Sequence, residues 1–198
     1  MAENIHTVFD QILTRKDKES LLNQRSCTIW LTGLSGSGKT SIASWLERKL
    51  HSEGFLVQVL DGDNIRSGIN NNLSFTEEDR KENIRRIAEI SKLYINSGVI
   101  TINGFVSPTN EVRDLAKSII GEEDFIEVFI NTPLHVCEER DVKGLYKKAR
   151  SGEIKNFTGI GAPFDVPKDA DCVVETENST IAESGQKLYD FVIKRIKK

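Results

Sequence analysis

The sequence predicts an α/β fold, in which helices cover both faces of an open parallel β-sheet. Apolar, β-branched segments alternate along the chain with segments whose apolar residues recur at helical spacing. The first apolar segment leads into a glycine-rich loop and then into a helix-compatible segment. At 198 residues the chain has the length of one domain and is long enough to bury a sizeable core.

Five segments are expected to form the strands, and they are residues 28–32, 55–60, 99–106, 125–130 and 172–174. The helices between them are expected at residues 41–48, 76–98, 110–120 and 181–196, with Pro133 suited to the first turn of a further helix. Thr76 and Asp79 form a capping pattern at the start of the second of these helices. Because strands and helices alternate throughout, we expect a parallel sheet.

The glycine-rich loop matches the pattern G-x-x-x-x-G-K-[ST] of a phosphate-binding loop. Its residues are Gly33, Leu34, Ser35, Gly36, Ser37, Gly38, Lys39 and Thr40, followed by Ser41. Glycine lets the backbone N–H groups turn toward a polyphosphate, and the following helix adds its positive end. We expect Lys39 to reach the β and γ phosphates and Thr40 to bind Mg²⁺. The alternative is a glycine-rich turn that binds nothing.

An acidic turn, Asp61-Gly62-Asp63, follows the second predicted strand. Ligands of open α/β sheets bind outside the carboxyl ends of the strands, so this turn is expected beside the phosphate loop. One carboxylate could hold Mg²⁺ while the other orients or deprotonates an acceptor hydroxyl. The alternative is a turn that only caps a helix at Asn64.

Cations that could hold a second anion follow this turn. Arg66 and Arg80 are the stronger candidates, because they lie nearest the end of the strand and the start of the next helix. Residues 141–168 combine many Lys and Arg residues with glycine and proline, which predicts a mobile basic lid and not core. Such a lid would exclude water during phosphoryl transfer. The alternative is a solvated basic loop.

Composition restricts the classes of function. The net charge is −3, so no global basic field favours nucleic acid or a membrane surface. The start of the chain lacks the apolar segment of a signal peptide, and we expect a soluble, cytoplasmic protein. Cys27, Cys137 and Cys172 are odd in number and far apart, which predicts buried, reduced thiols and no metal site.

Residues 1–26 are expected to form an N-terminal helical arm, packed on the domain or on a second subunit, with residues 27–198 as one kinase domain. Val8, Phe9, Ile12 and Leu13 give the arm a short helical stripe.

The chain has no N-K-x-D segment for guanine, which disfavours a GTPase. It also lacks the strand with adjacent terminal acids that is typical of mechanical ATPases. A kinase for a small acceptor fits better.

Together these motifs resemble the adenylylsulfate kinase family, over nearly all of residues 27–167. The segments that carry the resemblance are Thr28-Ile29-Trp30-Leu31-Thr32-Gly33-Leu34-Ser35-Gly36, Leu60-Asp61-Gly62-Asp63-Asn64-Ile65-Arg66, Glu82-Asn83-Ile84-Arg85-Arg86-Ile87, Phe105-Val106-Ser107-Pro108, Lys143-Gly144-Leu145-Tyr146-Lys147-Lys148-Ala149-Arg150 and Phe157-Thr158-Gly159-Ile160. The resemblance implies a P-loop kinase fold, ATP and Mg²⁺, and phosphorylation of the 3′-hydroxyl of adenosine 5′-phosphosulfate. It also suggests a homodimer.

The resemblance assigns roles to individual residues. Lys39, Asp61, Asp63 and Ser107 are the expected catalytic residues, with Thr40 and Asp61 at the metal. The sulfonucleotide would be bound by Asp63, Arg66, Phe75, Arg80, Asn83, Val106, Ser107, Lys143, Leu145 and Phe157. Its adenine would stack between Phe75 and Phe157, with Phe164 as the alternative lid aromatic. Ser107 has been treated in the family as a possible phosphoserine, but a hydrogen bond to nucleotide is the simpler role.

The sequence departs from the family after Ser107-Pro108, where an aromatic residue and an arginine are usual. Thr109 and Asn110 stand there, and Arg113 is the candidate replacement for the missing cation. Gly161 stands where aspartate is frequent.

Two alternative functions remain open from the sequence. One is a related small-acceptor kinase, of nucleoside monophosphates or of the shikimate type, and the other is a nucleotide-binding protein without activity.

Overall fold

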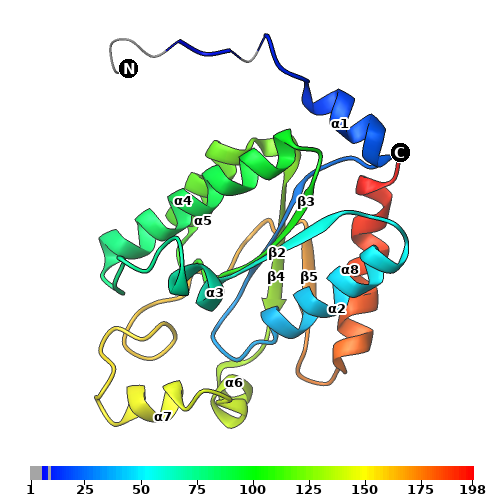
Figure 1. Cartoon of the computed structure of the whole chain (residues 1–198). Helices are drawn as coiled ribbons and strands as arrows, with labels where there is room; N and C mark the ends of the chain where they lie inside the picture. Colours follow the sequence, from blue (N-terminus) through cyan, green and yellow to red (C-terminus); the bar gives the residue numbers. More distant parts are fainter. Residues whose placement is uncertain (1–5, 9) are drawn as a thin grey trace.

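The computed structural model of the chain describes residues 6–8 and 10–198. Its elements are α1 (Arg15–Leu22), β1 (Thr28–Thr32), α2 (Lys39–Ser52), β2 (Val57–Asp61), α3 (Gly62–Ser67), α4 (Glu77–Asn96), β3 (Ile100–Gly104), α5 (Asn110–Ile120), the 3-10 helix η1 (Glu122–Asp124), β4 (Phe125–Asn131), α6 (Leu134–Arg140), α7 (Leu145–Arg150), β5 (Cys172–Glu175) and α8 (Ile181–Ile196). Figure 1 shows a central sheet between two layers of helices.

The five strands form one sheet in the order β2-β3-β1-β4-β5, and every neighbouring pair is parallel. The predicted α/β fold with a parallel sheet and helices on both faces is therefore confirmed. β1 lies at the centre, and all five of its residues are buried. A strand covered on both faces and both edges is largely apolar, which explains Ile29, Trp30 and Leu31, while the hydroxyls of the buried Thr28 and Thr32 are hydrogen-bonded.

Alternate residues of β1 pack against the two layers of helices. Ile29 and Leu31 belong to a core cluster that includes residues of α2 and α8, whereas Trp30 belongs to a cluster with residues of α4 and α5. This division follows from the strand's period of two. Trp30 fills its side of the sheet by packing against Phe105 and Phe125, with ring centroids 5.7 and 5.5 Å away.

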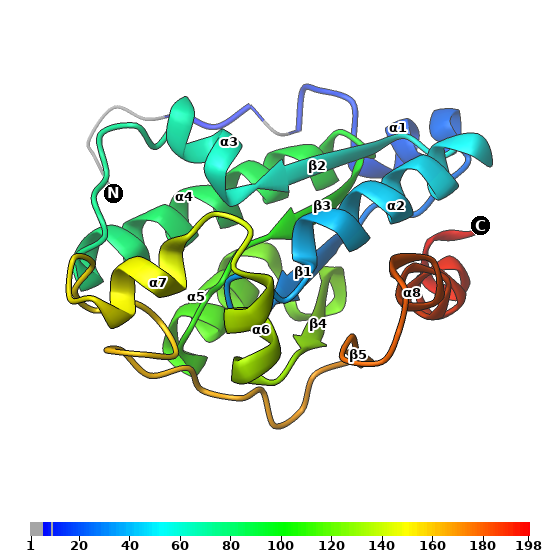
Figure 2. The same cartoon turned by 90° about the horizontal axis from the view of Figure 1, so that it is seen from below.

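The carboxyl ends of the strands are aligned, and this alignment builds the site. Asp61 at the end of β2 is in register with Gly104 of β3, which is in register with Leu31 of β1. Figure 2 shows α3, α6 and α7 gathered around this end of the sheet. Three segments that are distant in sequence, the phosphate loop, the acidic turn and residues 141–168, therefore lie beside one another.

Two strand predictions need correction at their ends. The segment predicted as residues 99–106 ends as a strand at Gly104, because Ser107 has a positive φ of 38° and Pro108 has no N–H to donate. The segment predicted as residues 55–60 begins at Val57 and extends through Asp61. The second change matters for function, because it makes Asp61 the terminal residue of a strand.

The prediction of a helical stripe over residues 8–13 is wrong where the structure describes it. The helix begins at Arg15, after a capping box formed by Thr14 and Asp17, while Ile12 and Leu13 lie outside it and are exposed. Phe9 lies outside the described residues. The helix itself is held to the domain by Arg15, whose guanidinium donates to both carboxylate oxygens of Asp124. A stripe of so few residues cannot form a helix without such partners.

Residues 141–168 are not excluded from the core, contrary to the prediction. They contain the helix α7, whose Tyr146 is 2% exposed and whose Ala149 is also buried. The count of charged residues misled the prediction, because Lys147, Lys148 and Arg150 of α7 are exposed while Tyr146 and Ala149 beside them are buried. We keep the word lid for residues 141–168. Their mobility remains a prediction.

Helix α8 packs against α2 so closely that one position requires glycine. A Cβ atom at Gly185 would lie 2.4 Å from Cε3 of Trp45. Gly185→Ala would normally stabilise a helix, but here we expect it to lower the free energy of unfolding by about 1–3 kcal/mol because the indole must move. Chemical denaturation measures this. Lys187→Ala, an exposed control on the same helix, should change stability by less than about 0.5 kcal/mol, and a more stable Gly185→Ala would refute the packing argument.

Candidate active site

The phosphate loop connects the central strand β1 to helix α2. Gly33, Gly36 and Gly38 all have positive φ angles, of 151°, 75° and 103°. At Gly33 a Cβ atom would lie 2.6 Å from the carbonyl oxygen of Ile130 on the neighbouring strand. Backbone atoms of β4 cannot give way, so glycine is required there by close approach as well as by backbone conformation.

The carbonyl groups of Gly36 and Ser37 are bound by side chains from outside the loop. The Ser37 carbonyl accepts hydrogen bonds from the hydroxyls of Thr132 and Thr176, at 3.0 and 3.2 Å. Arg140 donates to the carbonyls of Gly36 and Ser37, at 3.4 and 3.5 Å. The N–H of Ser37 donates to the carbonyl of Leu34 within the loop at 3.2 Å, so the other N–H groups of the loop are the ones expected to bind an anion, as in other backbone anion sites.

Thr132, Thr176 and Arg140 were not singled out as site residues by the sequence analysis. Each threonine follows the end of a strand, β4 or β5, which is the signal that the sequence offered. Their two hydroxyl oxygens lie 2.5 Å apart. Arg140 also donates to the Thr176 carbonyl at 2.7 Å, so its guanidinium links the phosphate loop to the residue that follows β5.

Lys39 is buried at the start of α2. Its ammonium group donates to the carbonyl oxygens of Gly33 and Leu34, at 2.8 and 2.7 Å. Both partners are neutral, and burial lowers the pKa of Lys39 to about 8. The side chain is therefore a buried cation without a carboxylate partner, at the position where a phosphate would be bound.

The acidic turn lies against the end of the phosphate loop. The Thr40 hydroxyl donates to Asp61 Oδ2 at 2.8 Å, while Asp61 Oδ1 accepts from the N–H of Asp63 and caps α3. Asp61 therefore caps a helix and also contacts the phosphate loop, while a role for the turn at Mg²⁺ or at an acceptor hydroxyl remains a prediction. Asp63 is exposed and forms an ion pair with Lys143 of the lid.

Thr40 and Asp61 supply a hydroxyl and a carboxylate oxygen, which are the hard oxygen ligands that Mg²⁺ prefers. Among the described residues there is no group of three or more His, Cys, Asp or Glu side chains that could hold a metal ion by itself. A magnesium ion at Thr40 and Asp61 would therefore complete its coordination with phosphate oxygens and water.

Arg66 and Arg80 form a second cationic site beyond the acidic turn. Both guanidiniums lie near the ring of Phe75, at 4.4 and 5.9 Å from its centroid. Burial lowers the pKa of both arginines, and for Arg66 the charge of Arg80 adds to the effect. Their hydrogen bonds go to neutral groups, so the pair has positive charge available for an anion.

Arg80 also connects Phe75 to the lid. It donates to the Phe75 carbonyl at 3.0 Å, and from its other nitrogens to the Asn156 carbonyl and the Thr158 hydroxyl, which flank Phe157. Arg80 thus links the backbone of Phe75 to the two residues that flank Phe157 in the chain. Phe157 packs edge-on against Tyr146, whereas the alternative, Phe164, stacks on Phe129.

Other predicted site residues are arranged differently. Ser107 is buried, and its hydroxyl oxygen accepts from Trp30 Nε1 at 3.1 Å and lies 3.1 Å from the Thr32 hydroxyl. The Thr32 hydroxyl donates to the carbonyl of Val106. Asn83 is buried and accepts a hydrogen bond from Asn70. Contacts of Asn83, Val106 and Ser107 with a nucleotide remain predictions.

A cavity of about 520 Å³ opens between the phosphate loop and the lid. It is lined by Leu34, Val166 and residues 159–164. Its volume is in the range of small-molecule sites. The site therefore has a phosphate loop, an acidic turn, a cationic pair and an adjoining cavity, all at the carboxyl end of the sheet.

Comparison with known proteins shows which family has this sequence pattern. A family model described as "Adenylylsulphate kinase" matches residues 25–175. The adenylyl-sulfate kinase of Bacteroides thetaiotaomicron is 58% identical over 195 residues, which is 98% of this chain and 97% of that protein. The adenylyl-sulfate kinase of Clostridium kluyveri is 51% identical, over 91% of this chain and 90% of that one. The chain belongs to the adenylylsulfate kinase family.

Solved structures agree with this membership. The APS kinase CysC of Mycobacterium tuberculosis, in complex with AMPPNP and APS, superposes with a TM-score of 0.82 at 45% identity, covering 85% of this chain and 98% of that one. A shikimate kinase of Acinetobacter baumannii is 16% identical with a TM-score of 0.54, and shares the fold alone. No helix in the described part of this family member is long and apolar enough to cross a membrane.

The departures from the family pattern after Pro108 have a structural explanation. Thr109 caps α5, and Asn110 accepts from Arg113. Arg113 is 2% exposed and donates to the carbonyls of Ser107 and Asp165, both at 2.8 Å. The suggestion that Arg113 replaces the missing cation in a nucleotide contact is therefore wrong, because its guanidinium is used to join the loop after β3 to the end of the lid.

The environment of Lys39 predicts a pH dependence of nucleotide binding. Below a pH of about 8 the buried amine is protonated and can bind phosphate, and above it the neutral form predominates. We expect the affinity for AMPPNP to fall by up to about tenfold per pH unit above this value, with uptake of a proton on binding at pH 9. Calorimetry in buffers of different ionisation enthalpy measures the proton.

Lys39→Ala removes the titrating group and serves as the control for this experiment. Its residual nucleotide binding should show no proton uptake at pH 9. Binding by the unmodified protein that is equally tight at pH 7 and pH 9.5, without proton uptake, would contradict the assignment of Lys39 as the buried cation that meets the phosphates.

Proposed function

We propose that the chain transfers the γ-phosphate of ATP to the 3′-hydroxyl of adenosine 5′-phosphosulfate, giving ADP and 3′-phosphoadenylylsulfate. One observation carries this proposal: the acidic turn lies between two separate cationic sites. On one side are Lys39 and the phosphate loop, and on the other are Arg66 and Arg80 with the ring of Phe75. Two anionic nucleotides therefore have a place, with carboxylates between them.

ATP would be bound through residues 33–41, and Lys39 would leave the carbonyls of Gly33 and Leu34 for the β and γ phosphates. Thr40 and Asp61 would hold Mg²⁺, which would bridge phosphate oxygens and neutralise the charge of the transferred group. No feature of this arrangement requires a covalent enzyme intermediate. Direct in-line transfer accounts for the reaction, and it leaves Ser107 with a supporting role.

The sulfonucleotide would be bound through Arg66, Arg80 and Phe75, with Phe157 covering its adenine from the lid. The 3′-oxygen attacks the γ-phosphorus, the bond from that phosphorus to the β-γ bridging oxygen breaks, and Asp63 accepts the hydroxyl proton. Lys143 pairs with Asp63 in the structure. We propose that it moves to the sulfonucleotide when this substrate is present, which leaves the Asp63 carboxylate as the base.

Two further properties concern the assembly and the location of the chain. The exposed Ile12 and Leu13 before α1 favour a second copy of the chain as partner, in a homodimer. The use of ATP and the net charge of −3 favour a cytoplasmic enzyme that binds neither nucleic acid nor membranes.

An assay of ADP release across acceptors tests the proposed reaction. With ATP and Mg²⁺ we expect turnover with adenosine 5′-phosphosulfate and little with AMP or shikimate, and removal of Mg²⁺ by a chelator should abolish it. Asp63→Asn should lower kcat by about 10²- to 10⁴-fold, because it removes the base, while the KM for ATP changes little.

Asp169→Asn, an exposed aspartate at the end of the lid, is the matched control and should retain full activity. Turnover with shikimate or a nucleoside monophosphate, but none with adenosine 5′-phosphosulfate, would replace this proposal by a different small-acceptor kinase. A folded protein that binds nucleotide but phosphorylates none of these acceptors would favour a relative without activity.

A further inference from the structure

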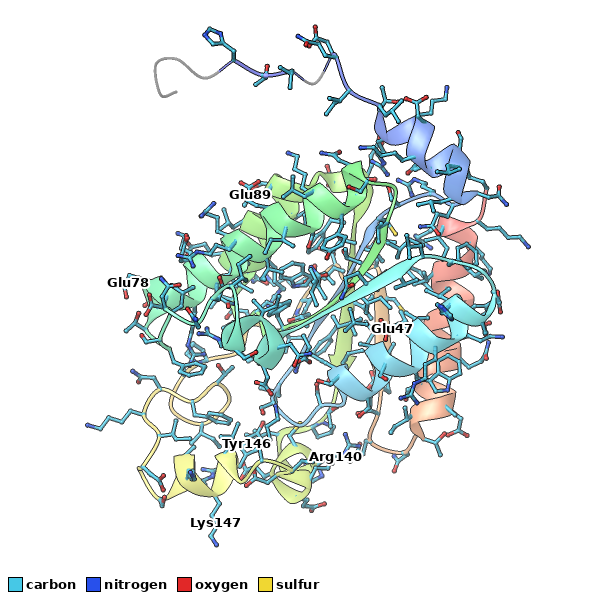
Figure 3. The ribbon with its side chains drawn as sticks, in the orientation of Figure 1. Glu47, Glu78, Glu89, Arg140, Tyr146 and Lys147 are labelled. Carbon is cyan, nitrogen blue, oxygen red and sulfur yellow. The ribbon has the colours of Figure 1, made fainter. Side chains whose placement is uncertain are left out.

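Tyr146 joins the lid to the phosphate loop. Its hydroxyl donates to the carbonyl oxygen of Ser35 at 2.9 Å, although the two residues are 111 positions apart. Figure 3 shows Tyr146 on the side of α7 that faces the body of the protein, whereas Lys147 points away into solvent. The lid therefore contributes directly to the backbone cradle that is proposed to bind ATP.

Because of this contact, three consecutive carbonyl groups of the loop, those of residues 35–37, accept hydrogen bonds from side chains outside the loop. Gly36 and Ser37 are held from the sheet side, by Arg140, Thr132 and Thr176. Ser35 is held from the lid side. If the Ser35 carbonyl were released, the peptide between Ser35 and Gly36 could rotate, and the N–H of Gly36 would lose its orientation toward a phosphate.

Tyr146 is itself held firmly in place. Its side chain is buried, and its ring packs edge-on against Phe157, with ring centroids 5.0 Å apart. The backbone N–H groups of Tyr146 and Lys147 donate to the carboxylate of Asp141. Burial raises the pKa of Tyr146, so its hydroxyl keeps its proton and remains a donor at physiological pH.

One group that holds Tyr146 belongs to the proposed acceptor site, and a second residue of that site lies close to Tyr146 in the chain. Phe157 is the expected partner of the acceptor's adenine, and Lys143, three residues before Tyr146, pairs with Asp63. Movement of either group on acceptor binding would be transmitted to Tyr146 through the ring contact or through the start of α7. The path from the acceptor to the phosphate loop then consists of two contacts, from Phe157 to Tyr146 and from Tyr146 to Ser35.

We propose that Tyr146 is a positioning residue that couples the two substrate sites, by holding the Ser35 carbonyl of the phosphate loop from the lid. This inference rests on the proposed function, because it takes the acceptor to be the nucleotide that contacts Phe157. Such coupling is reciprocal, so acceptor binding strengthens ATP binding by the factor by which ATP strengthens acceptor binding.

Tyr146→Phe tests the proposal, because it keeps the ring and its contact with Phe157 and removes the hydroxyl. The dissociation constant of AMPPNP is measured with and without adenosine 5′-phosphosulfate, alongside the melting temperature, the KM for ATP and kcat. We expect AMPPNP to bind about fivefold to tenfold more weakly to the variant alone, since one backbone carbonyl loses its donor. The acceptor should tighten AMPPNP about fivefold or more in the unmodified protein and hardly at all in the variant.

Tyr189→Phe is the matched control. It removes a hydroxyl that donates to Glu53, away from the site, and should leave every binding constant unchanged. Equal AMPPNP affinities and equal acceptor effects in Tyr146→Phe and the unmodified protein would overturn the inference. A lowered melting temperature with unchanged binding would also overturn it, since that is the signature of a purely structural tyrosine.

The proposed function and this inference fail in different ways. Turnover of adenosine 5′-phosphosulfate by the unmodified protein tests the function without reference to Tyr146. If that turnover is present and Tyr146→Phe behaves as the unmodified protein, the inference alone is wrong. If turnover is absent, the affinity for AMPPNP alone still decides whether the Tyr146 hydroxyl positions the phosphate loop.

Discussion

The site depends on the outward binding of three consecutive carbonyl groups in the phosphate loop. A peptide presents its N–H to a ligand only if its C=O finds a partner on the other side, because a backbone polar group left unpaired in the interior is costly. Here the partners come from four places: the ends of β4 and β5, helix α6 and the lid helix α7. The loop is thus shaped by the parts of the chain that surround it, and its own glycines only permit that shape.

The fold could be predicted from the sequence because the relevant signals are local. The alternation of Ile29, Trp30 and Leu31 and the capping residue Thr76 determine a strand and a helix start from a few neighbouring positions. The errors arose where tertiary contacts decide. Of the stripe predicted at residues 8–13, the described residues Val8, Ile12 and Leu13 are exposed and so gain no burial from forming a helix. The lid is rich in charged residues, so its sequence did not indicate that Tyr146 is buried. This burial depends on contacts with the phosphate loop and with Phe157.

The candidate site was predictable to the extent that it follows motifs. The glycines, Lys39, Thr40 and Asp61 lie together as their spacing suggested, and the family to which the chain belongs was indicated by the same residues. Thr132, Thr176 and the role of Tyr146 were not predictable, because a hydroxyl that supports a carbonyl has no sequence pattern of its own. For Arg113, charge suggested an anion site, whereas the structure shows a buried cation that binds backbone carbonyls.

The arrangement also explains how one small domain can bring two anionic nucleotides together. Positive charge is divided between the phosphate loop and the Arg66–Arg80 pair, and the carboxylates of the acidic turn separate them. Lys143 of the lid meets Asp63, and Arg80 meets the chain on either side of Phe157, so the lid touches both halves of the site. Closure of the lid over one substrate, which remains a prediction, would therefore also change the surroundings of the other.

The most direct measurement is a crystal structure of the chain with AMPPNP, Mg²⁺ and adenosine 5′-phosphosulfate. The account predicts that Lys39 Nζ leaves the carbonyls of Gly33 and Leu34 for the phosphates, while the carbonyls of residues 35–37 keep their outward partners. The ribose 3′-oxygen should lie in line with the γ-phosphorus and within hydrogen-bond distance of Asp63. A phosphate loop whose carbonyls turn inward, or a second nucleotide bound away from Arg66 and Arg80, would contradict it.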